Sequence, residues 1–166
     1  MVHGNRRKFP IDMSLRLRSD QVAMKSLLEK MDFEVSHLYE KGRPIALTGR
    51  FAERIAERHY ASIAHCEGND SDVAPWIKTI LAAIASNFAL ADCLSSGAVT
   101  ATAWLAVFGE DERKPPPIAP ELIAAATQAN VTLFIENYTC FDEEGIPEKL
   151  WLNGPEAQND SGSDPV

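Results

Sequence analysis

The chain has 166 residues, of which 45% are hydrophobic, and a formal net charge of −8. This length and composition predict a single domain. No apolar run reaches the length of a membrane helix, about 20 residues, and no apolar segment of signal-peptide length follows the basic N-terminus. We therefore expect a cytoplasmic protein. The acidity lies in residues 110–166, which hold 3 Lys and Arg against 12 Asp and Glu, a net of −9; it argues against general nucleic-acid binding and suits a basic partner.

The first patterned segments alternate between strand and helix. Residues 1–11 are an unpatterned leader, and residues 13–18 alternate apolar with polar side chains, as in a half-buried strand. Ser19 is the predicted cap of a helix whose apolar residues at 24–31 share one face. Residues 33–39 predict a second strand.

The middle of the chain contains the strongest helical pattern. Residues 45–57 leave helix, strand and loop open, and residues 59–66 predict a third strand. Asp72 is the predicted N-cap of a helix, because apolar side chains at helical spacing follow it as far as Phe88. Residues 98–108 have apolar side chains on both faces, which is typical of a central strand.

Two further elements and a polar segment end the chain. Residues 115–117 are three prolines that predict a rigid connector. A helix at 121–130 and an alternating strand at 131–138 follow. Residues 153–166 are rich in Asn, Gly, Asp, Ser and Pro, which predicts a disordered acidic tail, so we place the single domain at 12–152.

The predicted order is β-α-β-β-α-β followed by α-β. The first six elements match a ferredoxin-like βαββαβ core, which the last pair extends. We therefore predict an α+β fold in the form of a two-layer sandwich, with the helices on one face of a mostly antiparallel sheet.

Several of these segments resemble a family of small bacterial proteins known as domain of unknown function 4279. The motifs are the loop at Lys41-Gly42, the helix opening Pro120-Glu121-Leu122 and the strand ending Ile135-Glu136-Asn137-Tyr138, and the resemblance covers about residues 12–140. It implies a bacterial α+β protein. It implies no activity and assigns no functional residues, because the family has none.

Metal-ligand and catalytic residue types are crowded at residues 59–72 without a common geometry. On a strand, His59 and His65 share a face but lie ~20 Å apart at ~3.3 Å per residue. His65 and Cys66 point to opposite faces, which separates the thiol from the imidazole. The other candidates in this segment are Glu67, Asp70 and Asp72. We predict no metal, no cofactor and no catalytic residue.

Two further groups have simpler interpretations. The three cysteines, Cys66, Cys93 and Cys140, are odd in number and far apart, which predicts reduced thiols with at least one in the core. The carboxylates of Glu143 and Glu144 lie in a predicted surface loop and are expected to be solvated.

A sheet with helices on one face leaves its other face open. If Leu15, Leu105 and Leu133 point to the helices, alternation places basic and aromatic residues on the open face. This predicted binding set consists of Arg16, Arg18, Trp104, Phe108, Phe134 and Tyr138. Such a set is similar to platforms for single-stranded RNA, but the RNP consensus is absent and the net charge has the wrong sign.

We predict a non-enzymatic protein-interaction module, of an inhibitor or immunity type, which acts through the open face or the acidic third. The alternative is a ligand-sensing regulatory domain that binds a small metabolite at a dimer interface, by analogy with the fold. We expect the open face to be covered by a second copy, or by the C-terminal segment with Trp151 as an anchor, ahead of a different protein and, third, a small ligand. Neither membrane nor nucleic acid is an expected partner.

Overall fold

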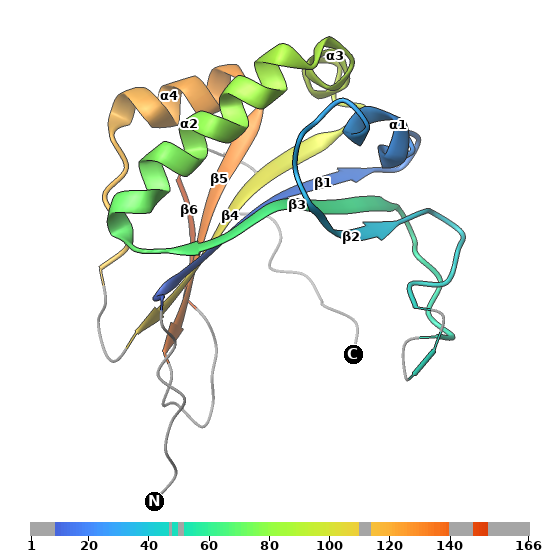
Figure 1. Cartoon of the computed structure of the whole chain (residues 1–166), viewed down its shortest axis with the longest axis horizontal. Helices are drawn as coiled ribbons and strands as arrows, with labels where there is room; N and C mark the ends of the chain where they lie inside the picture. The colour runs from blue at the N-terminus through green and yellow to red at the C-terminus, as the bar shows by residue number, and fades with distance from the viewer. Residues whose placement is uncertain (1–8, 47, 50–51, 110–113, 140–147, 153–166) are drawn as a thin grey trace, which may run out of the picture.

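The computed structural model describes residues 9–46, 48–49, 52–109, 114–139 and 148–152, in which helices cover one face of a sheet (Figure 1). The strands are β1 (Ile11–Ser19), β2 (Val35–Tyr39), β3 (His59–Gly68), β4 (Thr100–Gly109), β5 (Val131–Thr139) and β6 (Glu148–Trp151). The helices are α1 (Met24–Leu28), α2 (Asp70–Ser86), α3 (Phe88–Ser95) and α4 (Pro120–Gln128). This arrangement confirms the predicted α+β class with two layers.

The strand order of the sheet is β2-β3-β1-β4-β5-β6. β1 lies between β3 and β4 and pairs antiparallel with both, while β2 pairs antiparallel with β3, and β6 with β5. Among the described strands only β4 and β5 are parallel, because α4 carries the chain back between them. The sheet is therefore mostly antiparallel, as predicted.

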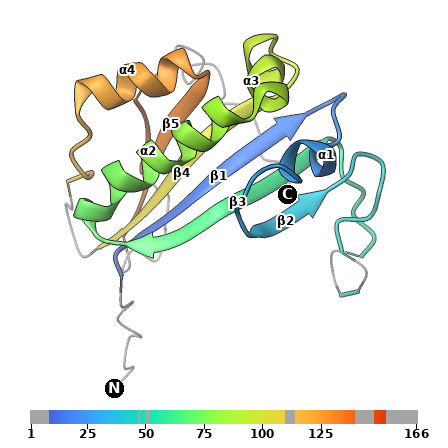
Figure 2. The same cartoon turned by 45° about the horizontal axis from the view of Figure 1, so that its top comes forward.

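Strand alternation gives the sheet two different faces. Leu15, Leu105 and Leu133 are fully buried in the core, as predicted, and they contribute to one cluster with the apolar side chains of the helices. The side chains at alternate positions, such as Arg16 and Trp104, lie on the opposite face. None of the described helices covers that face (Figure 2), which we call the open face.

The helix after β1 is shorter than predicted, and Ser19 does not cap it. α1 begins at Met24, whereas Ser19 is the last residue of β1. The Ser19 hydroxyl donates to the carbonyl of Ala98 at 2.6 Å and accepts from the backbone N–H of Val22 at 2.8 Å. It therefore forms a local turn and ties the end of β1 to the segment before β4. These hydrogen bonds take the place of the helix cap that the sequence predicts for this serine hydroxyl. Met31 is buried but lies beyond the helix.

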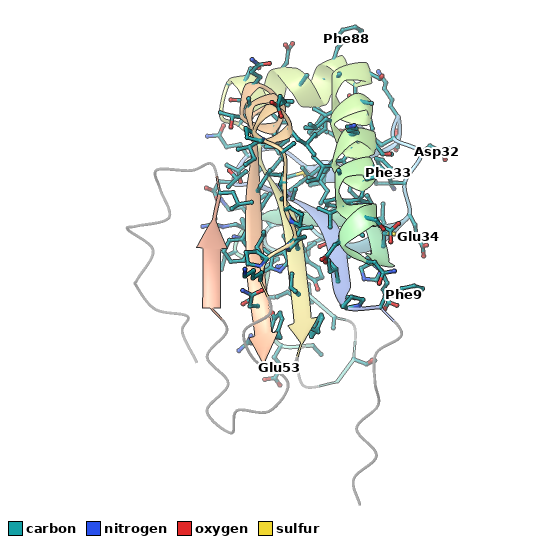
Figure 3. All side chains as sticks on the ribbon, turned by 90° about the vertical axis from the view of Figure 1, so that its left-hand side faces the viewer. Phe9, Asp32, Phe33, Glu34, Glu53 and Phe88 are labelled. Atoms are coloured by element: carbon teal, nitrogen blue, oxygen red, sulfur yellow. The ribbon has the colours of Figure 1, made fainter. Side chains whose placement is uncertain are left out.

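The long helix predicted to reach Phe88 is two helices. The chain bends by 97° between α2 and α3, at Asn87. The Asn87 side chain donates from Nδ2 to the carbonyl of Leu27 at 2.8 Å and accepts at Oδ1 from the N–H of Leu90 at 3.2 Å. Because of this bend Phe88 points away from the core and is 82% exposed (Figure 3).

The start of α2 also differs from the prediction. Asn69 is the N-cap, and Asp72 is the third helical residue, whose carboxylate accepts from the backbone N–H of Asn69 at 2.8 Å. The two residues form a reciprocal capping box, so Asp72 stabilises the start of α2 as its third residue and not as the N-cap.

The remaining segments are the two ends of the chain and the loop at 45–57. β1 begins at Ile11, the last residue of the predicted leader, and β6 was not predicted. The described part of 45–57 contains neither helix nor strand, apart from a bridge between Pro44 and Ile55. The predicted tail at 153–166 lies outside the described residues.

None of the helices in the described ranges is long and apolar enough by itself to cross a membrane. α2 and α3 pass that test only when taken together, and the 97° bend separates them.

Asn87→Ala is expected to lower the free energy of unfolding by about 2–3 kcal/mol, because the Leu27 carbonyl and the Leu90 N–H lose their partner in a buried corner. Urea unfolding followed by circular dichroism measures this loss. The matched control is Ser86→Ala, since the exposed Ser86 hydroxyl bonds only the carbonyl of Ala82 in its own helix. An Asn87→Ala loss as small as that of the control would contradict the assigned role.

Candidate ligand-binding site

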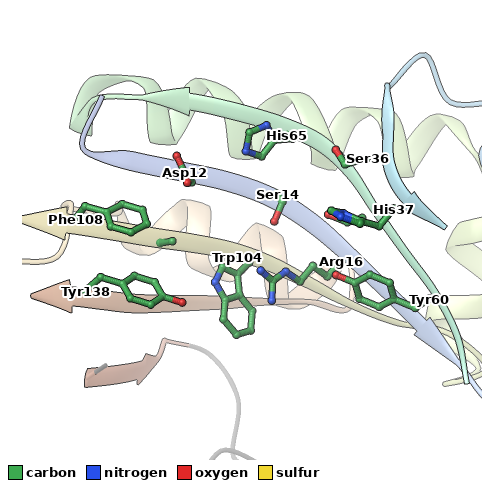
Figure 4. A pocket seen from close by; sticks show the side chains of 12 residues that line it. Asp12, Ser14, Arg16, Ser36, His37, Tyr60, His65, Trp104, Phe108 and Tyr138 are labelled. Atoms are coloured by element: carbon green, nitrogen blue, oxygen red, sulfur yellow. The ribbon is translucent and has the colours of Figure 1, made fainter. Parts of the chain in front are cut away.

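The open face of the sheet contains a hollow of about 380 Å³ (Figure 4). β1, β2, β3, β4 and β5 all contribute side chains to it. Besides its two histidines, four aromatic side chains line it, those of Tyr60, Trp104, Phe108 and Tyr138. The titratable groups in its lining besides tyrosine are Asp12, Arg16, His37 and His65. The volume lies in the range of sites that hold small molecules, about 300–1,000 Å³.

Arg16 lies at the centre of the hollow, over the ring of Trp104. Its Cζ is 3.7 Å from the ring centroid, the geometry of a cation–π contact. Burial lowers the pKa of the Arg16 guanidinium from its ordinary value, although arginine stays charged at neutral pH. Within the described residues no carboxylate forms an ion pair with this guanidinium. The hollow thus contains a partly buried positive charge that has no ion-pair partner among the described residues.

Two N–H donors at the same place also lack an acceptor. Arg16 Nε and Trp104 Nε1 are buried and form no hydrogen bond. A buried donor without a partner costs about 1–3 kcal/mol. Two such donors on adjacent strands are unsatisfied polar groups in the wall of the hollow.

The aromatic side chains are paired by the parallel register of β4 and β5. Trp104 lies beside Phe134, with ring centroids 4.1 Å apart, and Phe108 stacks on Tyr138 at 4.9 Å with an interplanar angle of 12°. At the β3 side, Tyr60 stacks on Tyr39 at 5.4 Å. The hollow therefore has stacked rings at two ends and a tryptophan between them.

Tyr138 is held by a buried carboxylate. Its hydroxyl donates to Glu136 Oε2 at 2.6 Å, and Glu136 is only 5% exposed. Burial, followed by this hydrogen bond and the negative charge of Glu136, raises the pKa of Tyr138 to about 12. Tyr138 therefore stays neutral at physiological pH, and its ring orientation is fixed.

A β-bulge in β3 brings His65 to the hollow. Ala64 and His65 together lie opposite the single residue Ser14 of β1. Ala64 adopts a left-handed φ of 55°, which residues other than glycine rarely do, and its carbonyl accepts from Trp76 Nε1 at 2.9 Å. Because the bulge adds one residue, His65 faces the hollow in place of Ala64 (Figure 4).

This bulge makes the predicted common face of His59 and His65 wrong. Tyr60 faces the hollow, so its neighbour His59 points to the other side of the strand, whereas His65 joins Tyr60. A second register shift, between Val35 and His37 in β2, places His37 opposite Ser62 and at the hollow. Alternation alone does not reveal either histidine, because both depend on an inserted residue.

The predicted binding set is only partly brought together. Arg16, Trp104, Phe108 and Tyr138 line the hollow. Phe134 lies on the same face but is 1% exposed, so it supports Trp104 from within the protein and is not a surface group. Arg18 is exposed beside the hollow, with its Cζ 5.9 Å from the Tyr60 ring.

Other lining residues were missed although their signal was present. Asp12 and Ser14 follow from the same alternation that placed Arg16, and Tyr60 and Ser62 follow from the alternation of β3. Asp12 and Ser14 carry acidic or small side chains, which fall outside the basic and aromatic pattern of the predicted set, and Tyr60 and Ser62 lie on β3, which that set does not include.

The other chemical candidates do not assemble in the described ranges. No group of three His, Cys, Asp or Glu side chains there is placed to hold a metal ion. Cys66 is an exposed free thiol that donates weakly to the carbonyl of Glu67 at 3.5 Å, and Cys93 is a free thiol packed against the core. Cys140, Glu143 and Glu144 lie outside the described residues.

Comparisons of the chain with protein-family models, with curated proteins and with solved structures give no match.

Tyr138 is expected to ionise at about pH 12, whereas ordinary tyrosines ionise near 10. Because the folded-state pKa is the higher one, the stability that this group contributes is fully present below about pH 10 and is lost as the pH rises through about 12. Phenolate absorbance, recorded with circular dichroism as a check of the fold, measures the step.

The ionisation step at about pH 12 should disappear in Tyr138→Phe and persist in Tyr39→Phe. Glu136→Gln should move the step to lower pH, because the amide removes the negative charge beside the phenol. If all 3 tyrosines of the folded chain ionise together near pH 10, the contact between Tyr138 and Glu136 is not as described.

Proposed function

We propose that this protein is a non-enzymatic binding module that holds a small organic anion in the hollow of its open face. The observation that carries the proposal is the Arg16 guanidinium, which lies 3.7 Å over Trp104 without an ion pair among the described residues. A partly desolvated charge of this kind is stabilised by an opposite charge from outside the chain. The alternative interpretation of the sequence was a ligand-sensing regulatory domain with its metabolite at a dimer interface; the site geometry supports its small ligand but places that ligand in the hollow of one chain.

The contacts in the hollow support binding more than catalysis. The Tyr138 hydroxyl donates a hydrogen bond to Glu136, so neither group is poised as a base toward the hollow. His37 and His65 form no hydrogen bond with a serine hydroxyl or a carboxylate in the described residues, which leaves any nucleophile there without a base. We therefore keep the proposal of a protein without catalytic residues or cofactor.

The strand order supports the finer fold proposal. β2-β3-β1-β4, with every neighbour antiparallel, is the order expected for a ferredoxin-like core, and β5 and β6 extend it. The resemblance to domain of unknown function 4279, the cytoplasmic location and a hollow at a dimer interface stay predictions.

Arg16→Gln is expected to abolish ligand binding, because it removes the positive charge from the hollow. The test is a thermal-shift screen with small carboxylates and phosphate esters, each paired with its uncharged amide or alcohol. At least one acid, but not its uncharged analogue, should raise the melting temperature of the wild type by mass action.

The matched control is Arg18→Gln, which removes an equal charge from an exposed position beside the hollow. This variant should keep the response to the acid. The proposal fails if no acid stabilises the wild type, or if Arg16→Gln responds as the wild type does.

As a second candidate we propose a protein-interaction module that acts through the sheet edge at β2. This edge strand exposes Val35 by 41% and Leu38 by 39%, and among the described strands it has a neighbour only on its β3 side. Exposed edge strands pair with strands of other chains.

Leu38→Glu is expected to convert a dimer of this kind to monomers, because it places a charge at the apolar edge. Light scattering after size exclusion should give about twice the chain mass of 18.3 kDa for the wild type and a single chain mass for the variant. Arg16→Gln serves as the control and should leave the mass unchanged. A monomeric wild type at high concentration excludes self-pairing.

A further inference from the structure

We infer that the ligand of the hollow is an aromatic carboxylate, in which a flat ring is joined by a short chain to a single carboxylate group. The inference rests on the proposed function and specifies its ligand. It follows from the donors that Arg16 offers, from the charges around it and from the rings at the far end of the hollow (Figure 4).

The donor geometry of Arg16 favours a carboxylate. Its Nε is buried against the protein, which leaves the two terminal Nη nitrogens as the donors that a ligand can reach. Two parallel N–H groups of a guanidinium match the two oxygens of one carboxylate.

The surrounding charges favour a monoanion over a phosphate. Arg16 is the one Lys or Arg side chain that lines the hollow in the described residues. Asp12 also lines it, and the buried Glu136 lies close enough to raise the pKa of Arg16 by its charge. Because two carboxylates lie near the one guanidinium, a second negative charge on the ligand would meet repulsion without a cation of its own.

The far end of the hollow favours an aromatic ring. Phe108 and Tyr138 lie four residues beyond Trp104 and Phe134 in their strands, or ~13 Å along the sheet at ~3.3 Å per residue. Since the Tyr138 hydroxyl is engaged by Glu136, this end offers ring surface and no free phenol donor. A ligand that reaches from Arg16 to this stack needs a flat apolar group on a short spacer.

The test is a two-dimensional NMR titration of the full chain with four probes: 3-phenylpropionate, 3-cyclohexylpropionate, 3-phenylpropanamide and inorganic phosphate. We expect 3-phenylpropionate to bind most tightly. The saturated acid should bind about threefold to tenfold more weakly, since it lacks the ring contact. The amide should bind at least about tenfold more weakly, since it lacks the charge-assisted hydrogen bonds.

Phe108→Leu locates the ring end, because leucine keeps apolar volume but removes the ring. This variant should bind the two acids about equally. If it fails to fold, the order of the four probes on the wild type decides by itself.

The outcomes separate the inference from the function on which it rests. The aromatic carboxylate is overturned if the saturated acid or phosphate binds as tightly as 3-phenylpropionate. If Arg16→Gln abolishes that binding, the proposed anion site is still supported. If none of the four probes binds, and the wider panel of acids also gives no stabilisation, the proposed function falls together with the inference.

Discussion

The structure depends on the position of β1 at the centre of the sheet. β1 pairs with β3 on one side and with β4 on the other, so its period-two alternation governs both neighbours. Leu15 and Leu17 are fully buried in the core, while Arg16 between them lies on the open face. A shift of the register by one residue would place the arginine in the core, and the cost of burying its charge prevents that shift.

The same register builds the site. In-register pairing of β4 with β5 brings Trp104 to Phe134 and Phe108 to Tyr138, so one tilted and one stacked aromatic pair arise without further loops. Trp104 in turn supports the guanidinium of Arg16 from the adjacent strand. A site on a rigid sheet keeps its geometry in the absence of ligand, which lowers the ordering cost of binding.

Two irregular positions, the β-bulge in β3 and the bend between α2 and α3, place side chains where a regular strand or helix would not. The bulge at Ala64 has a left-handed φ of 55°, costs backbone strain and lies next to the hollow, where it presents His65. The Trp76 indole holds the bulge from the helical layer through the Ala64 carbonyl. Asn87 has a comparable role in the other layer, where one buried amide fixes the corner between α2 and α3.

The sequence by itself determined the class of fold, the two faces of β1, β4 and β5 and four of the hollow-lining residues, because alternation and helical spacing are local properties of the chain. Arg16, Trp104, Phe108 and Tyr138 were all placed on the open face in this way. Only the tertiary structure decided that Phe134 is buried, that Phe88 is exposed and that His65 joins the hollow. Each of these depends on a register, a bend or a bulge, which is set by contacts between segments distant in the chain.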